Sequence, residues 1–371
     1  MFGHGALRGR NKVDRLNAET IKRLALEVGF HVCGITLPAT AAQAGARIDE
    51  WAAQGKHGNM SYLEDFARRS EQFWSEFPEA KSVIVLGLNY YSNSSTGSVN
   101  NGGLTSPTDL GSAALKGRVA RYAWGKDYHW VIKEKLEILK KQLTAHAGKP
   151  VRFHSAIDTK PLAERDLAEK AGLGFIGKQT QLLSLQYGPW LFLSELVTDL
   201  DLEPDMAFEG SCGTCQLCID VCPTEAIEED KALDARKCIA YLTIENKEAI
   251  PSEFRDKIGH WVFGCDDCLN ICPFTNGQQE TDCRELTAAE GFGPHLNLEN
   301  IFDLASQGVY EKQFKGTAIL RARHKQLLRN ACVVLGNSND RSAIPVLKKA
   351  LKHGSKLVRE HAEWALQKLG G

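Results

Sequence analysis

The spacing of eight cysteines constrains this 371-residue chain more than any other feature. The thiols fall into two runs, Cys212-x2-Cys215-x2-Cys218-x3-Cys222-Pro223 and Cys265-x2-Cys268-x3-Cys272-Pro273. Cys238 lies between the runs and supplies the thiol that the second run lacks. Three thiols spaced two residues apart can surround one face of an iron–sulfur cubane, so the runs predict iron–sulfur ligands.

The cysteine that precedes each proline is expected to bind the cluster of the other run. This crossed arrangement is the rule in two-cluster bacterial ferredoxins. It yields one set made of Cys212, Cys215, Cys218 and Cys272. The other set is Cys238, Cys265, Cys268 and Cys222. Because the eight thiols fill both sets with none left over, the sequence predicts two 4Fe-4S clusters.

Two alternatives explain the spacing less well. Structural zinc sites usually show two separated C-x2-C pairs, whereas this chain has three thiols within seven residues. A disulfide framework is typical of small secreted domains. The first residues of this chain lack the apolar core of a secretory signal, so disulfides are disfavoured as well.

Length and composition predict a multidomain α+β protein. A chain of 371 residues exceeds one ordinary core. We expect an α/β domain at 1–198, a two-cluster ferredoxin-like domain at 199–290 and a helical domain at 291–371. No apolar run approaches the roughly 18 residues that cross a membrane. Because reduced thiols suit a reducing compartment, we expect a cytoplasmic protein without membrane contact.

The first domain is expected to contain a sheet covered by helices. Helices are predicted at 20–28, 47–54 and 132–143, and apolar strands at 30–37, 82–88, 151–157 and 190–197. The strand at 82–88 is apolar throughout, as in a strand buried on both faces. This alternation indicates an α/β layer. The segment 91–108 is rich in Ser, Asn and Gly, and it is expected to be a loop, either a lid or a segment without function.

Asp158 follows the strand at 151–157, at the kind of strand end where active-site residues collect. Two roles are open for it. It could cap a helix that begins near Thr159, with Pro161 in the first turn. Alternatively, it could transfer a proton during catalysis.

The C-terminal segment is basic and repetitive. From Lys312 to Gly371 the chain carries 13 Lys or Arg against three acidic residues, a net charge of +10, so the rest of the chain carries −11. Helices predicted at 330–336, 343–351 and 360–370 indicate a HEAT-like array, with an ordinary helical bundle as the alternative. The charge would suit a polyanionic partner, but a solvated helical face would also explain it.

Two clusters relay single electrons and perform no organic chemistry themselves. The 211 residues before Cys212 leave room for a domain that holds an electron acceptor. Gly172-x-Gly174-x-x-Gly177 matches a dinucleotide-binding pattern. However, it follows a helix and precedes a strand, the reverse of that fingerprint. A nucleotide acceptor is therefore rejected.

Several segments together resemble the epoxyqueuosine reductase family. They are the split set of eight cysteines and the segments 121–129, 157–165, 171–178 and 222–227. The resemblance covers residues 20–371. It implies a cobalamin-dependent oxidoreductase that reduces epoxyqueuosine to queuosine at the wobble position of tRNA, with the clusters as electron relay. It also implies the tRNA anticodon stem-loop as partner and an external electron donor, and we expect a monomer.

The resemblance assigns roles to individual positions. Asp158 matches the proton donor, and a carboxylic acid with a raised pKa suits that role because opening an epoxide reductively puts charge on oxygen. The residues expected near the corrinoid or substrate are Tyr122, Asp158, Arg165, Gly177, Lys178 and Gln179. His129 is not expected to bind cobalt, because its segment lacks the Gly of the D-x-H-x-x-G signature. Contacts to RNA phosphates are expected from Lys325, Arg329, Lys356 and Arg359.

Two hypotheses compete with this one. A corrinoid reductase of the dehalogenase type, acting on a small molecule, would use the same two clusters. An enzyme that acts on a small molecule would not need the basic C-terminal segment, whereas the phosphates of an anticodon stem-loop would bind its positive charges. A non-enzymatic RNA-binding module would not need the clusters.

Overall fold

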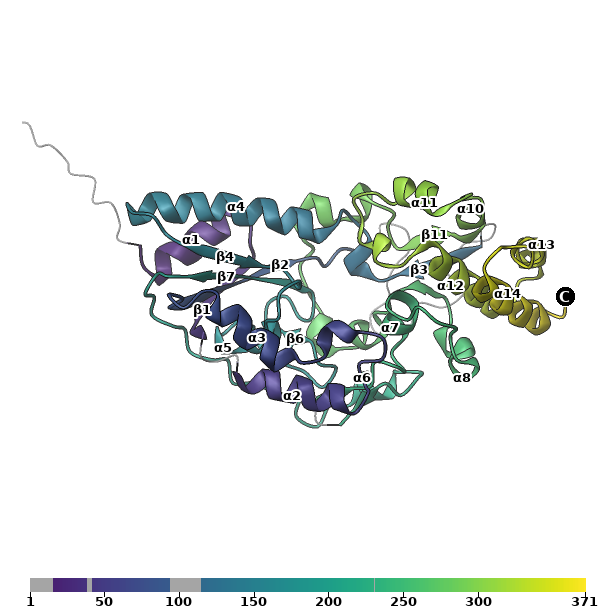
Figure 1. Ribbon diagram of the computed structural model, residues 1–371, viewed down its shortest axis with the longest axis horizontal. Coiled ribbons are helices and arrows are strands. Elements are labelled where there is room, and N and C mark those ends of the chain that lie inside the picture. Colours follow the sequence, from purple (N-terminus) through teal and green to yellow (C-terminus); the bar gives the residue numbers. More distant parts are fainter. Residues whose placement is uncertain (1–15, 39–41, 94–114, 230) are drawn as a thin grey trace, which may run out of the picture.

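The computed structural model describes residues 16–38, 42–93, 115–229 and 231–371. Most of the loop predicted at 91–108 lies outside these residues. Figure 1 shows an elongated molecule, with a sheet covered by helices at one end and the C-terminal helices at the other. None of the helices in the described segments is both long enough and apolar enough to cross a membrane.

The main sheet has four strands. Its order is β1 (Val32–Thr36), β2 (Ser82–Asn89), β7 (Leu191–Thr198) and β4 (Phe153–Ala156). Every residue of β2 is buried, as its apolar run predicts. All three pairings are antiparallel, so the layer is not the parallel sheet typical of α/β folds. β2 is apolar because helices cover both faces of the sheet (Figure 1). A sheet can be covered on both faces whether its strands are parallel or antiparallel.

Two groups of helices cover the sheet. α1 (Ala18–Val28) and α4 (Tyr128–Ala147) pack on one face through the buried residues Leu24, Ile132, Leu136 and Leu139. α3 (Phe66–Ser75) and α5 (Glu164–Lys170) pack on the other face. α2 (Ala42–Ala53) contacts α3. Gly29 is the C-cap of α1, with a φ of 94° in the left-handed region that favours glycine.

The start of α5 differs from the expectation. The helix predicted to begin near Thr159 starts later: α5 begins at Glu164 after an N-cap at Ala163. Asp158 therefore caps no helix, and the capping role is wrong. Its backbone has a φ of 46°, in the left-handed region that a residue with a side chain rarely adopts. A short hairpin follows α5, formed by β5 (Phe175–Ile176) and β6 (Leu182–Leu183).

A second sheet connects all three predicted domains. β3 (Lys116–Val119) lies between β10 (Trp261–Phe263) and β11 (His295–Asn297). These strands come from the segments 1–198, 199–290 and 291–371 in turn, so hydrogen bonds cross both predicted boundaries. The cysteine region itself contains α6 (Leu217–Asp220), β8 (Ile227–Glu228), β9 (Ala232–Leu233), α7 (Ile239–Ile244), α8 (Ser252–Arg255) and α9 (Asp267–Asn270).

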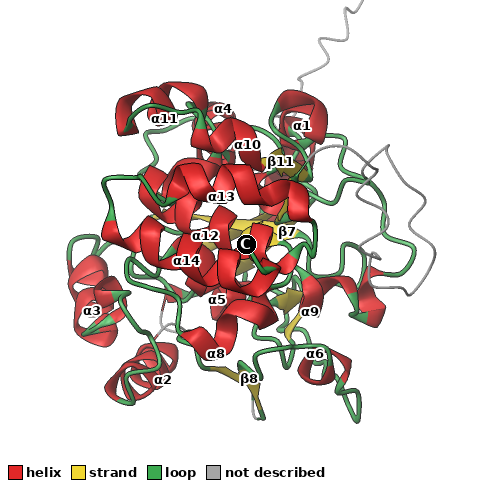
Figure 2. Cartoon of the chain, turned by 90° about the vertical axis from the view of Figure 1, so that its right-hand side faces the viewer, coloured by secondary structure: helices red, strands yellow, loops and turns green. Residues whose placement is uncertain are grey.

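The C-terminal part is helical. It consists of α10 (Leu298–Phe302), α11 (Gln307–Gln313), α12 (His324–Asn337), α13 (Ile344–Ala350) and α14 (Lys356–Leu369). Figure 2 looks onto this end and shows α12, α13 and α14 in front. α12 is almost entirely buried, and α14 packs along it through Val358, Ala362 and Ala365. Cys332 lies fully buried in this core, outside the eight-cysteine set.

Candidate active site

Asp158 is held by two side chains from the first turn of α4. The oxygen Asp158 Oδ1 lies 2.9 Å from His129 Nε2. Tyr128 Oη donates a hydrogen bond to Asp158 Oδ2. The other ring nitrogen of His129, Nδ1, lies 2.7 Å from Asp127 Oδ1. His129 therefore bridges two carboxylates, of which Asp127 also caps α4.

These contacts set the charges in the site. Hydrogen bonds to Asp127 and Asp158 raise the pKa of His129 to about 9, although burial opposes this. Burial raises the pKa of Asp158, but hydrogen bonds from His129 and Tyr128 outweigh it, and the net pKa is lowered. The expected raised pKa of Asp158 is thus wrong. At neutral pH the carboxylate is ionised and the imidazole carries the proton.

The backbone of Asp158 is tied to α5. Its N–H donates to Glu164 Oε1 over 2.6 Å. Burial, followed by the negative charge of Asp158, raises the pKa of Glu164 to about 7. Arg165, the next residue, donates from Nη1 to the Thr180 carbonyl over 3.0 Å. α5 therefore connects Asp158 to the turn that contains Thr180.

That turn contains three predicted site residues, Gly177, Lys178 and Gln179. A Cβ at Gly177 would lie only 2.3 Å from Gln179 Oε1, so the Gln179 side chain would have to move to admit a side chain there. Gln179 is 4% exposed, and its Nε2 has no hydrogen-bond partner in the described part of the chain. A buried amide donor without an acceptor is uncommon and indicates a group that binds there.

Lys178 connects the turn to the cysteine region. Its backbone N–H donates to Cys212 Sγ over 3.4 Å, and its Nζ donates to the Cys215 carbonyl over 2.9 Å. The ammonium group thus binds the cysteine region in this structure. A chain of direct contacts runs from Asp158 through α5 and this turn to a cysteine of the first set.

The structure brings the first cysteine set together. Cys272 packs with Cys212 in one small apolar cluster. Burial, and then the neighbouring thiols of Cys212, Cys218 and Cys215, raise the pKa of Cys272 to about 11. Cys272 therefore lies beside the first run, although Cys268 is only four positions away in the sequence.

The structure also brings the thiols of the second cysteine set together. Burial raises the pKa of Cys268, and the thiols of Cys238 and Cys222 raise it further. Cys265 has Cys268 and Cys238 as thiol neighbours. No three His, Cys, Asp or Glu side chains in the described segments lie close enough to share one metal ion. The thiolates of a 4Fe-4S cubane do not need to share one metal ion, because each thiolate binds a different iron atom.

Aromatic side chains surround Tyr128 beside Asp158. Its ring stacks on Phe192 with centroids 4.2 Å apart and on His129 at the same distance. Tyr90 stacks on Phe192 at 4.3 Å. Tyr122, a predicted cofactor contact, lies edge-on to Tyr128 at 6.4 Å. These flat apolar surfaces, together with the unpartnered amide of Gln179, fit a large macrocycle that carries peripheral amides.

Arg329, a predicted RNA contact, is fully buried, so that prediction is wrong. Its guanidinium donates to the backbone carbonyls of Leu242, Asn246 and Glu248. Burial lowers its pKa to about 9. The position faces the core because nearly every residue of α12 is buried, and a cation there binds carbonyls instead of solvent.

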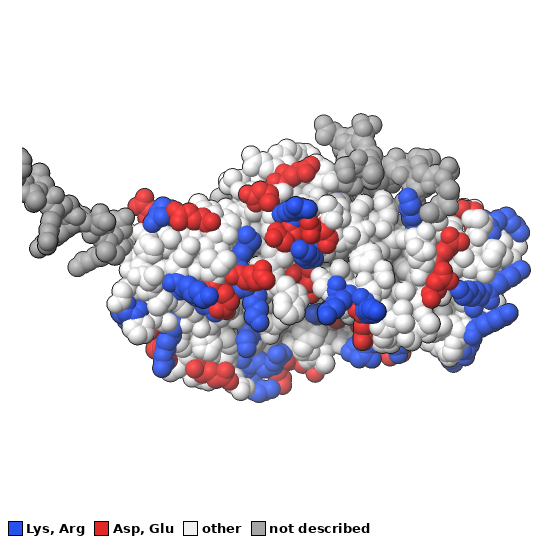
Figure 3. Space-filling view, turned by 90° about the horizontal axis from the view of Figure 1, so that it is seen from above, with Lys and Arg blue, Asp and Glu red and all other residues white. Residues whose placement is uncertain are grey.

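The other predicted RNA contacts lie at the surface. Lys325 and Lys356 are exposed, and Arg359 is half-buried and donates to the His353 and Gly354 carbonyls. Figure 3 shows Lys and Arg side chains gathered at the end of the molecule where α13 and α14 lie.

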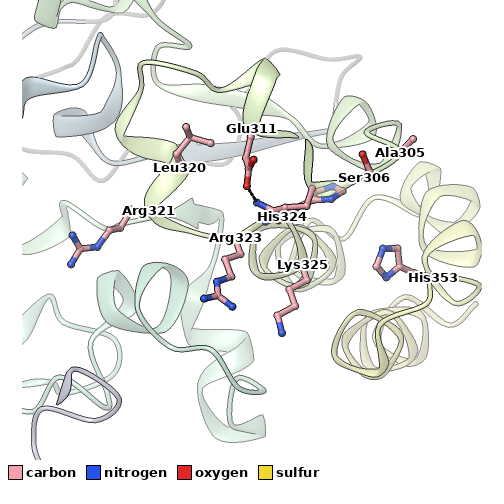
Figure 4. Close-up of a pocket in the computed structure, with 10 residues that line it drawn as sticks. Ala305, Ser306, Glu311, Leu320, Arg321, Arg323, His324, Lys325 and His353 are labelled. Atoms are coloured by element: carbon pink, nitrogen blue, oxygen red, sulfur yellow. Dashed lines mark hydrogen bonds between the residues drawn. The ribbon is translucent and has the colours of Figure 1, made fainter. Parts of the chain in front are cut away.

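An open groove of about 790 Å³ lies beside α12 (Figure 4). Arg321, Arg323 and Lys325 line it together with His324 and His353. The positive charge of Arg321 also lowers the pKa of Asp158, so this side of the groove lies toward the active site.

Sequence reasoning missed four side chains of the site: Tyr128, His129, Glu164 and Glu195. The sequence argues against His129 as a cobalt ligand and indicates no other role for it. Glu195 is the one charged residue in strand β7, and a buried charged residue is a signal of function because unpaired charged side chains are rarely buried. No local pattern predicts that Tyr128 and His129 meet Asp158, about 30 positions later.

Three family models match this chain. One described as "Epoxyqueuosine reductase QueG, DUF1730" matches residues 72–159. A "4Fe-4S double cluster binding domain" matches residues 211–275, which include all eight cysteines. A model of "HEAT repeats" matches residues 317–371, which confirms the predicted repeat.

Relatives match nearly the whole chain. The epoxyqueuosine reductase of Pseudomonas aeruginosa is 38% identical over 363 residues, covering 95% of this chain and 94% of the relative. That of Xanthomonas campestris pv. campestris is 36% identical and covers 95% of this chain and 96% of the relative. A solved epoxyqueuosine reductase with an epoxyqueuosine-modified tRNA-Tyr stem loop superposes with a TM-score of 0.81 at 30% identity, covering 95% of this chain and 90% of that one. This protein belongs to the epoxyqueuosine reductase family.

Proposed function

We propose that this protein reduces epoxyqueuosine to queuosine at the wobble position of tRNA. Two observations support this proposal most: the similarity to epoxyqueuosine reductases extends over 95% of the chain, and an ionised Asp158 lies beside His129. The reaction breaks the epoxide C–O bonds, consumes two electrons and two protons, and releases the oxygen as water. The chain must therefore supply electrons one at a time and protons at a defined position.

The two 4Fe-4S clusters supply the electrons. They are the cofactors indicated by the double-cluster family match over all eight cysteines. The contact of the Lys178 N–H with Cys212 Sγ supports an exit for electrons at the turn that contains Gly177 and Gln179. An external electron donor would reduce the clusters again. We expect the protein to act as a cytoplasmic monomer.

Cobalamin is the reactive cofactor of this family, and when bound it supplies the two-electron reduction that opens the epoxide. The residues that would hold it are Tyr122, Arg165, Gly177 and Gln179, with Lys178 fixing the turn. The unpartnered amide of Gln179 supports this assignment most directly. The chain itself orients the substrate, excludes water with its aromatic side chains and moves protons at Asp158.

The proton chemistry is shared between two residues. Because Asp158 is ionised and His129 is charged, the proton near the substrate belongs to the imidazolium. Asp158 can accept that proton through its hydrogen bond and present it to the leaving oxygen. Tyr128 holds the second carboxylate oxygen and so fixes the orientation of Asp158.

The C-terminal helices would bind the tRNA. Arg321, Arg323 and Lys325 line the groove beside α12, and their charges suit the phosphates of an anticodon stem-loop. Lys356 and Arg359 would extend this surface onto α14. Phosphate contacts of this kind position the RNA without reading its sequence.

An anaerobic turnover assay tests the proposal against the small-molecule alternative. Protein reconstituted with iron, sulfide and cobalamin is given either an epoxyqueuosine-modified stem-loop or a haloaromatic compound, with a chemical reductant. We expect loss of one oxygen atom from the RNA nucleoside and no halide release. Halide release without conversion of the RNA would favour the dehalogenase-type function.

A further inference from the structure

Glu195 is a fully buried acid that the mechanism above does not use. It lies in the middle of β7, opposite Val85 on β2 and Ala156 on β4. It is 0% exposed, and neither carboxylate oxygen has a hydrogen-bond partner among the described residues. An ionised carboxylate in such a place would cost several kcal/mol, so Glu195 is expected to retain its proton.

Glu195 faces the side of the sheet that carries α5. Side chains alternate along a strand, and its neighbours on the same face, Leu193 and Val197, pack in the core that α5 covers. Burial, and then the negative charges of Glu164 and Asp158, raise the pKa of Glu195. The protonated acid therefore lies beneath the loop that presents Asp158.

Glu164 lies in the first turn of α5, on the same side of the sheet as Glu195. Its Oε1 accepts the N–H of Asp158, and its own pKa is raised to about 7. The charged groups that act on Glu164 are Asp158, which favours its protonation, and Arg165 and His129, which oppose it. Glu164 is thus poised to gain or lose a proton near neutral pH.

The reaction needs two protons, and the pair of Asp158 and His129 holds one. We propose that Glu195 and Glu164 form a proton store that supplies the second proton of each turnover. When the epoxide oxygen leaves, it takes one proton from His129 through Asp158 and a second from Glu164. Glu195 then passes its proton to Glu164 through a bridging water, because the two carboxyl groups share no direct hydrogen bond. Solvent restores the proton of Glu195 after the product leaves. This inference rests on the proposed function, which supplies the electrons.

A spectroscopic experiment tests the store without any activity. In the protein lacking cobalamin, infrared difference spectra in H₂O and D₂O report the C=O band of protonated carboxyl groups. We expect such a band at pH 8 in the wild type and its loss in Glu195→Gln. Ser194→Ala is the matched control, because Ser194 is the adjacent buried residue of β7 and its Oγ is also unpartnered. A band that persists in Glu195→Gln would overturn the protonated state.

A turnover experiment tests the supply of the proton. At pH 6 Glu164 carries its own proton, so Glu195→Gln should convert the modified stem-loop at nearly the wild-type rate. At pH 8 Glu164 has lost its proton, and the variant should be slower by about 10²-fold, the usual effect of losing a proton-transfer group. Ser194→Ala should follow the wild type at both pH values.

Identical pH–rate profiles for wild type and Glu195→Gln would overturn the store. If Glu195→Gln does not fold, Glu164→Gln is the second variant, and it should be slow at both pH values. Failure of the proton store can be told apart from failure of the proposed function. If the proposed function fails, the wild type itself leaves the stem-loop unconverted, whereas the infrared test of Glu195 does not depend on turnover.

Discussion

His129 lies between the carboxylates of Asp127 and Asp158, and its charge holds both of them ionised. The raised pKa of His129 means that the folded protein binds this proton more tightly than the unfolded chain does. The ion pairs therefore add to the free energy of unfolding below pH 6.5, the ordinary value for His. That contribution is lost as the pH rises through about 9.

His129→Gln tests this arrangement. The amide cannot carry the proton, so we expect the single-turnover rate at pH 7 to fall by about 10²-fold. The lost charge should also let the pKa of Asp158 rise. Wild-type activity should hold to about pH 9 before it declines. Unchanged rate and pH dependence in the variant would contradict the role of His129 as proton carrier.

At the scale of elements, the cysteine runs were predictable because their spacing encodes local geometry. The crossed position of Cys272 follows from the proline after it. The start of α5 was not predictable, because Asp158 adopts a left-handed conformation that tertiary contacts with α4 stabilise. The burial of Arg329 was also missed, since a cation in an amphipathic pattern normally faces solvent.

The cluster partition gives a prediction at this scale. Cys272→Ala should damage the same cluster as Cys212→Ala, because the two thiols lie together. Iron content and electron paramagnetic resonance of each variant report which cluster is lost. Matching spectra for Cys272→Ala and Cys265→Ala would instead place Cys272 in the second set.

The two faces of α12 predict opposite phenotypes. Arg329→Met leaves the carbonyls of Leu242, Asn246 and Glu248 unpaired, so it should lower the free energy of unfolding by about 3 kcal/mol in a urea titration. Lys325→Ala should change stability by no more than about 0.5 kcal/mol. It should instead weaken stem-loop binding and reduce the salt slope by about 0.7 to 0.9. A large loss of stability in Lys325→Ala would contradict its assignment to the surface.

At the scale of the whole molecule, Asp158 follows β4 of the antiparallel sheet, the cysteine region binds the clusters, and Arg321 directly precedes the C-terminal helices α12, α13 and α14. Hydrogen bonds through the sheet of β3, β10 and β11 join all three segments. A sequence can suggest each part separately from its motifs. The contacts between parts, such as Lys178 with Cys212, depend on the folded arrangement and could not be predicted from spacing.

The most direct test of the account is a single anaerobic turnover by wild type and Asp158→Asn on an epoxyqueuosine-modified stem-loop. Mass spectrometry of the nucleoside follows the loss of one oxygen atom, and visible spectra record cluster and cobalamin content in the same samples. We predict complete oxygen loss by the wild type. Asp158→Asn, with equal cluster and cobalamin content, should leave the epoxide intact because the amide cannot relay the proton of His129. Oxygen loss at the wild-type rate by Asp158→Asn would contradict the account.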